Sequence, residues 1–240
     1  MIYLNNAATS WPKPEPTTRN LVSFWNSDPE LWDQLFNKSH KTICDFFNIK
    51  DPSRFIITSG ATASMNMVFT DMDWNTGDIV VTGSFEHHAL AGWEYRLQKN
   101  FGVEFKKIEP TEKDIFDLGS FENYIRENHR RIKLVAFTHA SNVTGDLLPA
   151  REILGLCRKY RILSMLDAAQ TAGIVEIDIE KLKPDIFFFA GHKGTMGPHG
   201  IGGLYLSENV EIHIPDVDFE TRGSNKMATH CDAGSINLEG

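Results

Sequence analysis

Seven short apolar runs, most of them separated by helical patterns, constrain the fold of this 240-residue chain more than any other feature. The runs predict strands because they are short and rich in β-branched and aromatic residues. They cover residues 54–58, 78–82, 103–108, 133–138, 161–167, 185–190 and 201–206. Apolar spacing predicts helices over residues 15–24, 29–47, 63–70, 88–100, 118–128 and 149–160. The alternation predicts a three-layer α/β/α fold with a mostly parallel seven-stranded sheet covered on both faces.

Charge and cysteine usage exclude several classes of protein. The net charge is −8, from 24 basic and 32 acidic residues, whereas a nucleic-acid binder needs a basic face. No apolar run is long enough to span a membrane, and the N-terminus lacks a signal-peptide pattern. Cys44, Cys157 and Cys231 are far apart, which predicts no disulfide framework or zinc site and fits the cytoplasm. The nine histidines form no ligand-spaced pair with an acidic partner, so no metal site is expected.

Polar residues follow almost every predicted strand. In parallel sheets, ligands bind at the carboxyl ends of the strands, so these residues are expected to meet at one edge. The segments concerned are 59–62, 86–88, 139–142, 167–170 and 192–193.

Lys193 stands where the apolar strand containing Phe187, Phe188 and Phe189 leaves the core. Burial lowers the pKa of a lysine and frees its neutral amine to attack a carbonyl carbon and form a Schiff base. The alternative is a lysine whose stem packs at the strand end while its ammonium reaches water.

Three further groups at this edge favour a ring-shaped, phosphorylated ligand. Asp167 could pair with a protonated ring nitrogen or cap the turn that follows it. His87 could stack on a flat ring and move protons, or be a structural histidine. The turn over residues 59–62 could hold an anion at a helix N-terminus, or be an ordinary strand-to-helix turn. Together with Lys193 they match what pyridoxal 5'-phosphate requires.

Six segments, in order along the chain, resemble the class V aminotransferase and cysteine desulfurase group of fold-type I pyridoxal-phosphate enzymes. They read YLNNAATSWPKP (3–14), TSGATASMNMV (58–68), EHHALAGWE (86–94), THASNVTGDLLP (138–149), LDAAQTAG (166–173) and AGHKGTMGPHGIGGLYL (190–206).

The resemblance implies a role for each matching residue. Lys193 would be the Schiff-base lysine and His87 the second catalytic residue, stacked on the ring. The remaining cofactor-binding residues would be Asp167 at the pyridine nitrogen, Gln170 at the ring hydroxyl, Asn142 beside the ring, and Ala61, Thr62 and His192 at the phosphate. Ser235, in a segment like the family's E-A-G-T-P-N, would reach the phosphate of the neighbouring subunit in a homodimer.

The chain also departs from the family pattern. Ala190 replaces the usual phosphate-contacting serine, and Asn5 replaces an aspartate. The expected division is an N-terminal active-site segment over residues 1–15 and a cofactor-binding large domain over residues 16–240. The C-terminal small domain, which carries the substrate-binding arginine and the desulfurase cysteine, is expected to be absent because the sequence stops at Gly240.

The resemblance implies an enzyme acting on an amino acid, with cysteine desulfuration the leading reaction. The alternative is a truncated homologue that binds pyridoxal phosphate or a partner chain without turnover.

Overall fold

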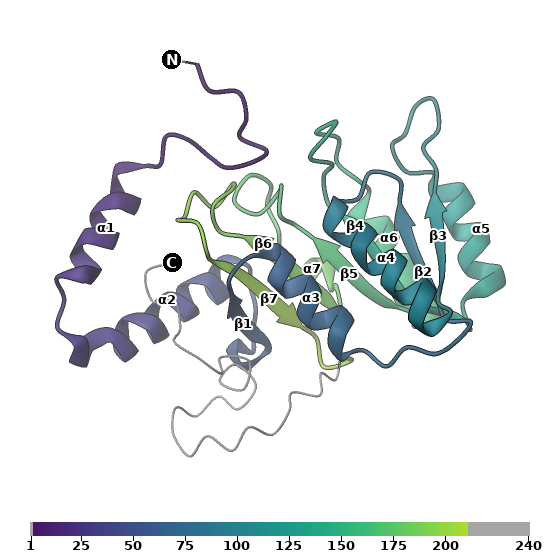
Figure 1. The fold of residues 1–240 in the computed structure, drawn as a ribbon, viewed down its shortest axis with the longest axis horizontal. Coiled ribbons are helices and arrows are strands. Elements are labelled where there is room, and N and C mark those ends of the chain that lie inside the picture. Colours follow the sequence, from purple (N-terminus) through teal and green to yellow (C-terminus); the bar gives the residue numbers. More distant parts are fainter. Residues whose placement is uncertain (1, 211–240) are drawn as a thin grey trace.

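A seven-stranded sheet forms the centre of the computed structural model, which describes residues 2–210 (Figure 1). Its strands lie in the order β1-β7-β6-β5-β4-β2-β3. The pairs β2–β3, β2–β4, β4–β5 and β5–β6 are parallel, whereas β7 runs antiparallel to both β6 and β1. The bounds are β1 Phe55–Thr58, β2 Ile79–Gly83, β3 Glu104–Ile108, β4 Ile132–Thr138, β5 Leu163–Asp167, β6 Ile186–Ala190 and β7 Gly202–Leu206. The predicted mostly parallel sheet is therefore confirmed.

Helices cover both faces of this sheet and enclose two hydrophobic cores. Residues of α3 and α4 pack on one face, and residues of α2, α5, α6 and α7 pack on the other. The helices are α1 Glu15–Trp25, α2 Trp32–Phe46, α3 Ala61–Asp71, α4 His88–Phe101, α5 Leu118–Asn128, α6 Ala150–Tyr160 and α7 Ile179–Leu182. The three-layer architecture follows from this two-sided burial.

Strand β6 shows how the apolar sequence becomes a two-sided core. Phe187 and Phe189 point into the core that contains Phe47, with ring centroids 5.0 Å from that ring. Phe188 points into the opposite core, because successive strand residues face opposite sides of a sheet. The strand is buried along its whole length, and its last residue, Ala190, lies at the edge where polar residues begin.

Several boundaries differ from the sequence prediction for local physical reasons. Helix α3 begins at Ala61 rather than 63, because Gly60 (φ 143°) turns the chain directly into it. Residues Pro29–Leu31 form a 3₁₀ turn, capped by the Asp28 side chain, before α2. Arg161, expected in a strand, is the left-handed C-cap of α6.

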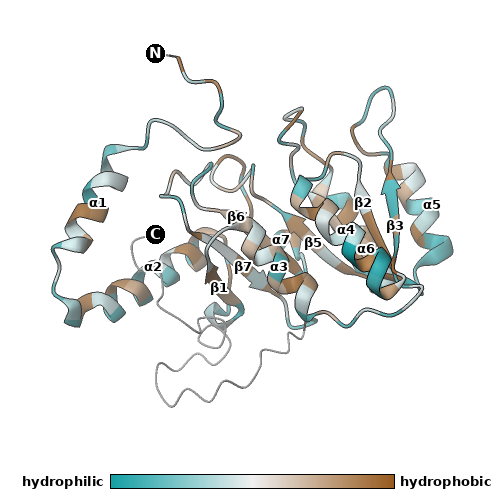
Figure 2. Ribbon diagram, in the orientation of Figure 1, coloured by the Kyte–Doolittle hydropathy of each residue, from teal (hydrophilic) through white to brown (hydrophobic). Residues whose placement is uncertain are grey.

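Helix α1 lies away from the body of the domain, and α2 leads from it toward the sheet, where Cys44 is buried in the core (Figure 1). Helix α1 buries none of its residues, and apolar side chains remain exposed at Val22, Trp25, Leu31 and Phe46. The hydropathy colouring shows apolar segments along this part of the chain (Figure 2). The sequence predicted the helical apolar spacing of α1 and α2, but most of the apolar face of these two helices is uncovered.

Candidate active site

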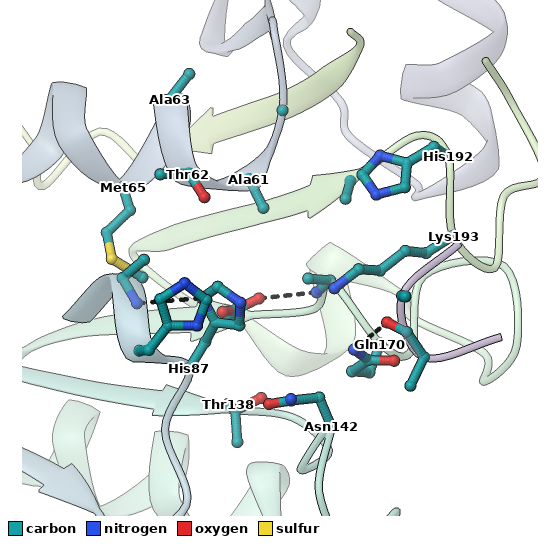
Figure 3. Close-up of a pocket in the computed structure, with 18 of the residues that line it drawn as sticks. Ala61, Thr62, Ala63, Met65, His87, Thr138, Asn142, Gln170, His192 and Lys193 are labelled. Atoms are coloured by element: carbon teal, nitrogen blue, oxygen red, sulfur yellow. Dashed lines mark hydrogen bonds between the residues drawn. The ribbon is translucent and has the colours of Figure 1, made fainter. Parts of the chain in front are cut away.

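A cavity of about 730 Å³ opens at the carboxyl ends of the parallel strands. It brings together every candidate residue that lies within residues 2–210, drawn from five loops (Figure 3). These residues are Ala61, Thr62, His87, Asn142, Asp167, Gln170, His192 and Lys193. Ser235 lies outside the described residues.

The N-terminus of α3 offers backbone amides to this cavity. Gly60 precedes the helix, and no side chain caps it. The first intrahelical bond comes from the Ser64 amide to the Gly60 carbonyl, so the amides of Ala61, Thr62 and Ala63 have no partner among the described residues. Free amides at a positive helix terminus suit a phosphate group.

Asp167 ends β5 at the floor of the cavity and is only 7% exposed. Its Oδ1 accepts a hydrogen bond from the Ala169 amide (2.8 Å), so the capping role considered from the sequence is real. Burial raises its pKa to about 6, while that amide and the charge of Lys193 oppose the rise. A buried carboxyl with one free oxygen can still pair with a protonated ring nitrogen.

Lys193 reaches into the cavity, with His87 on the opposite side (Figure 3). Its amine forms no hydrogen bond or ion pair with any residue between 2 and 210. Burial lowers the pKa of this amine, and the Asp167 carboxylate partly offsets the effect. An unpaired amine of lowered pKa in a cavity fits a nucleophile better than a solvated lysine.

His87 is the N-cap of α4, and its Nδ1 accepts a hydrogen bond from the Ala89 amide (3.2 Å). The neutral ring therefore carries its proton on Nε2. Burial, together with the positive charges of His88 and Lys193, lowers its pKa. His87 thus combines the structural role and the cavity-facing role that the sequence left as alternatives.

The N-terminal segment closes one side of the cavity through Asn5, Ala7 and Ala8. Gln170 donates a hydrogen bond from Nε2 to the Ala7 carbonyl (3.0 Å). Its contact with a ring hydroxyl, like that of Asn142 beside a ring, remains a prediction. The small side chains of the segment allow its backbone to approach the site closely.

Sequence reasoning gave Glu86 no role, although it stands beside His87. Its Oε1 accepts a hydrogen bond from the Gly83 amide (3.1 Å). Burial first and the Asp167 charge second raise the pKa of this carboxyl to about 8. Two carboxyl groups behind one cavity could not be inferred from the sequence, because their proximity depends on the register of β2, β4 and β5.

Two cysteines are core residues, as expected. Cys44 and Cys157 are free thiols with exposures of 1% and 0%. Burial raises their pKa values to about 11 and about 12. Neither can supply a thiolate at neutral pH. Cys231 lies outside the described residues.

Residues 2–210 contain no cluster of three or more His, Cys, Asp or Glu side chains suited to a metal ion. The same residues include no helix with the length and apolar character needed to cross a bilayer.

A family model described as aminotransferase class-V matches residues 2–237. This chain belongs to that family.

Named relatives of this class V chain include probable cysteine desulfurases. One from Pyrococcus abyssi is 32% identical over 222 residues, covering 87% of this chain and 54% of the relative. One from Chlamydia trachomatis is 27% identical and covers 100% of this chain and 64% of the relative. A cysteine desulfurase structure from Thermococcus onnurineus aligns with a TM-score of 0.87 at 27% identity, covering 100% of this chain and 64% of that one. The chain thus spans between about half and two thirds of the length of these relatives.

Proposed function

We propose that this protein binds pyridoxal 5'-phosphate and acts on an amino acid, with cysteine desulfuration as the reaction. The observation that carries the proposal is the single cavity in which the unpaired Lys193 amine, the buried Asp167 carboxyl and the uncapped N-terminus of α3 all meet. The family membership and the desulfurase relatives support it.

The residues of the cavity fit the cofactor group by group. The free amides of α3, with Thr62 and His192, would hold the phosphate, and Ala190 contributes no hydroxyl there. Asp167 would face the ring nitrogen, and Lys193 would bind the aldehyde carbon covalently. Gln170 and Asn142 would lie at the ring's polar edge.

When bound, pyridoxal phosphate supplies an electron sink for the substrate's α-carbon. Residues of the chain would orient the ring and move the protons. Asp167 would keep the ring nitrogen protonated, because Asp167 lines the cavity and its burial strengthens the charge pair. His87, with its proton on Nε2, would exchange protons near the substrate, while Lys193 would accept or return one from its amine.

Desulfuration converts cysteine into alanine and passes its sulfur to a thiol. That acceptor is neither Cys44 nor Cys157, because both are shielded and hold their protons. Solution thiols can serve as acceptors in a test.

The test combines absorbance with product analysis. The purified chain, given pyridoxal phosphate, should develop a visible absorption band that Lys193→Ala lacks. With L-cysteine and a reducing thiol it should then form alanine and sulfide in equal amounts. A band without products would favour the alternative of a cofactor-binding homologue without turnover, and no band would refute the cofactor assignment.

We further propose a homodimer in a reducing cytoplasm. Free thiols at Cys44 and Cys157 support the compartment. The exposed apolar residues of α1 and α2 support an assembly. The same proposal includes Ser235 acting on the phosphate of the partner subunit. It also includes a division of the chain into an N-terminal active-site segment, residues 1–15, and a large domain, residues 16–240.

A further inference from the structure

The carbonyl oxygen of His192, the residue directly before Lys193, accepts hydrogen bonds from an unusually large set of donors. The Ser10 amide (3.1 Å), the Ser10 hydroxyl (3.1 Å), the Thr9 hydroxyl (3.0 Å) and the Lys13 ammonium (2.7 Å) all point to it. All four donors come from residues 9–13, at the other end of the chain. One peptide group beside the cavity lysine is thus the anchor of the N-terminal segment.

Lys13 is the charged member of this set and makes the shortest of the four bonds. Its ammonium also donates to the Ser10 hydroxyl (2.8 Å), which itself donates to the same carbonyl. Lys13 forms no ion pair with a carboxylate in the part of the chain that the structure describes. Its ammonium bonds instead to the backbone of the lysine loop, the segment between β6 and β7 that contains Lys193. A hydrogen bond from a charged donor is stronger than one from a neutral donor.

Gly194, the residue directly after Lys193, is held by close backbone packing. A Cβ atom added to Gly194 would overlap the Ala172 carbonyl oxygen, and one added to Gly173 would lie 2.6 Å from the Gly194 carbonyl oxygen. The Gly197 amide also donates to the Gly191 carbonyl (2.7 Å). The backbone of Lys193 is therefore clamped through the residue after it, by residues 172–173, and through the residue before it, by the Lys13 contact.

We propose that Lys13 is a positioning residue: its bond to the His192 carbonyl fixes the His192–Lys193 peptide and so aims the Lys193 amine at the cofactor aldehyde. Ala7 and Ala8, in the same N-terminal segment, line the cavity. The inference rests on the proposed function, because it concerns attachment of the cofactor to Lys193. In that step the Lys193 nitrogen replaces the aldehyde oxygen as a C=N bond forms, and one water molecule leaves.

The test measures the rate of attachment, not turnover. Apo protein is mixed with pyridoxal phosphate, and growth of the visible band is followed by stopped flow at several pH values. Lys13→Met removes the charge and the donors at similar length, and Lys13→Arg restores both. Lys41→Met is the matched control, because Lys41 pairs with Asp45 on the exposed face of α2.

Lys13→Met should slow attachment about tenfold and move the pH midpoint of the band, since a misaimed nucleophile loses its oriented advantage. Lys13→Arg should recover most of the rate, and Lys41→Met should match the parent protein. Equal rates and midpoints for parent and Lys13→Met would overturn the proposal. If Lys13→Met does not fold, Ser10→Ala decides: a slower rate supports the clamp, and an unchanged rate refutes it. A parent protein without any band would instead refute the cofactor assignment itself.

Discussion

Two carboxyl groups and one amine set the electrostatics of the cavity. Burial raises the pKa of Asp167 to about 6 and that of Glu86 to about 8, and it lowers the pKa of Lys193. Burial at the cavity therefore penalises charges that have no partner. A phosphate at α3 and a protonated ring nitrogen at Asp167 would each meet a complementary group in place of lost water.

Asp167→Asn tests the role of the buried carboxyl. The variant should still attach pyridoxal phosphate to Lys193, because the amine and the α3 amides are untouched. It should lose cysteine turnover by about 100-fold or more, since a neutral amide cannot hold the ring nitrogen protonated. Single-turnover absorbance and alanine formation measure the two effects. Full activity in Asp167→Asn would contradict the assigned role.

Thr62→Val tests the phosphate end of the site. Losing one hydrogen bond to a charged group should weaken pyridoxal-phosphate affinity about tenfold. Pyridoxal, which lacks the phosphate, should bind both proteins equally. Equilibrium titration of the visible band checks this. An equal loss for both ligands would place Thr62 away from the phosphate.

At the scale of elements, the strand-to-loop junctions explain why the site assembles. Gly60 takes a backbone conformation (φ 143°) that opens α3 toward the cavity, and the glycines of residues 191–203 let the lysine loop pack against its neighbours. Lys193 and His87 follow the ends of the buried strands β6 and β2 by a few residues, and Asp167 is the last residue of β5. The sheet therefore sets positions that the loops alone could not hold.

This arrangement also explains how much the sequence could predict. Strand runs such as residues 186–190 are apolar throughout, so the sheet and its ligand-bearing edge were predictable. The short helix α7 was not, because four residues carry too little periodicity. Neither was the Lys13 contact with the His192 carbonyl, because a side chain bonded to a backbone atom 179 residues away leaves no mark in local pattern.

Two glycine-to-alanine substitutions compare a tightly packed loop position with an open helix position. Gly194→Ala should destabilise the fold by about 1–3 kcal/mol, because its Cβ meets backbone that cannot move aside. Gly92→Ala, within α4, meets nothing within 4 Å and should stabilise by about 0.5–1 kcal/mol. Urea unfolding of both variants measures this. A stabilising Gly194→Ala would show that the loop is not clamped.

At the scale of the whole molecule, the raised pKa of Glu86 makes the free energy of unfolding depend on pH. The folded protein keeps a proton on Glu86 up to about pH 8, whereas an unfolded chain loses it near the ordinary carboxyl pKa. Between these values the native state binds more protons, so stability falls as pH rises. Histidines of lowered pKa, such as His139, act in the opposite direction, but only below their ordinary pKa.

Glu86→Gln isolates this effect. Its unfolding free energy, relative to that of the parent, should rise by roughly 1 kcal/mol between about pH 6.5 and pH 8, because only the parent must ionise a carboxyl of raised pKa. Contributions from the histidines and Lys193 cancel in the difference. Urea unfolding of the apo proteins at four pH values measures it. Parallel profiles would mean that Glu86 ionises freely in the folded state.

The central claim is that Lys193 is the residue to which the cofactor attaches. Treating the protein with pyridoxal phosphate, reducing the adduct with borohydride and mapping the digest by mass spectrometry tests it directly. The adduct should lie on the peptide that contains Lys193 and should be absent from Lys193→Ala, with Lys13 and exposed lysines such as Lys41 unmodified. Adducts spread over surface lysines, or undiminished in Lys193→Ala, would contradict the account.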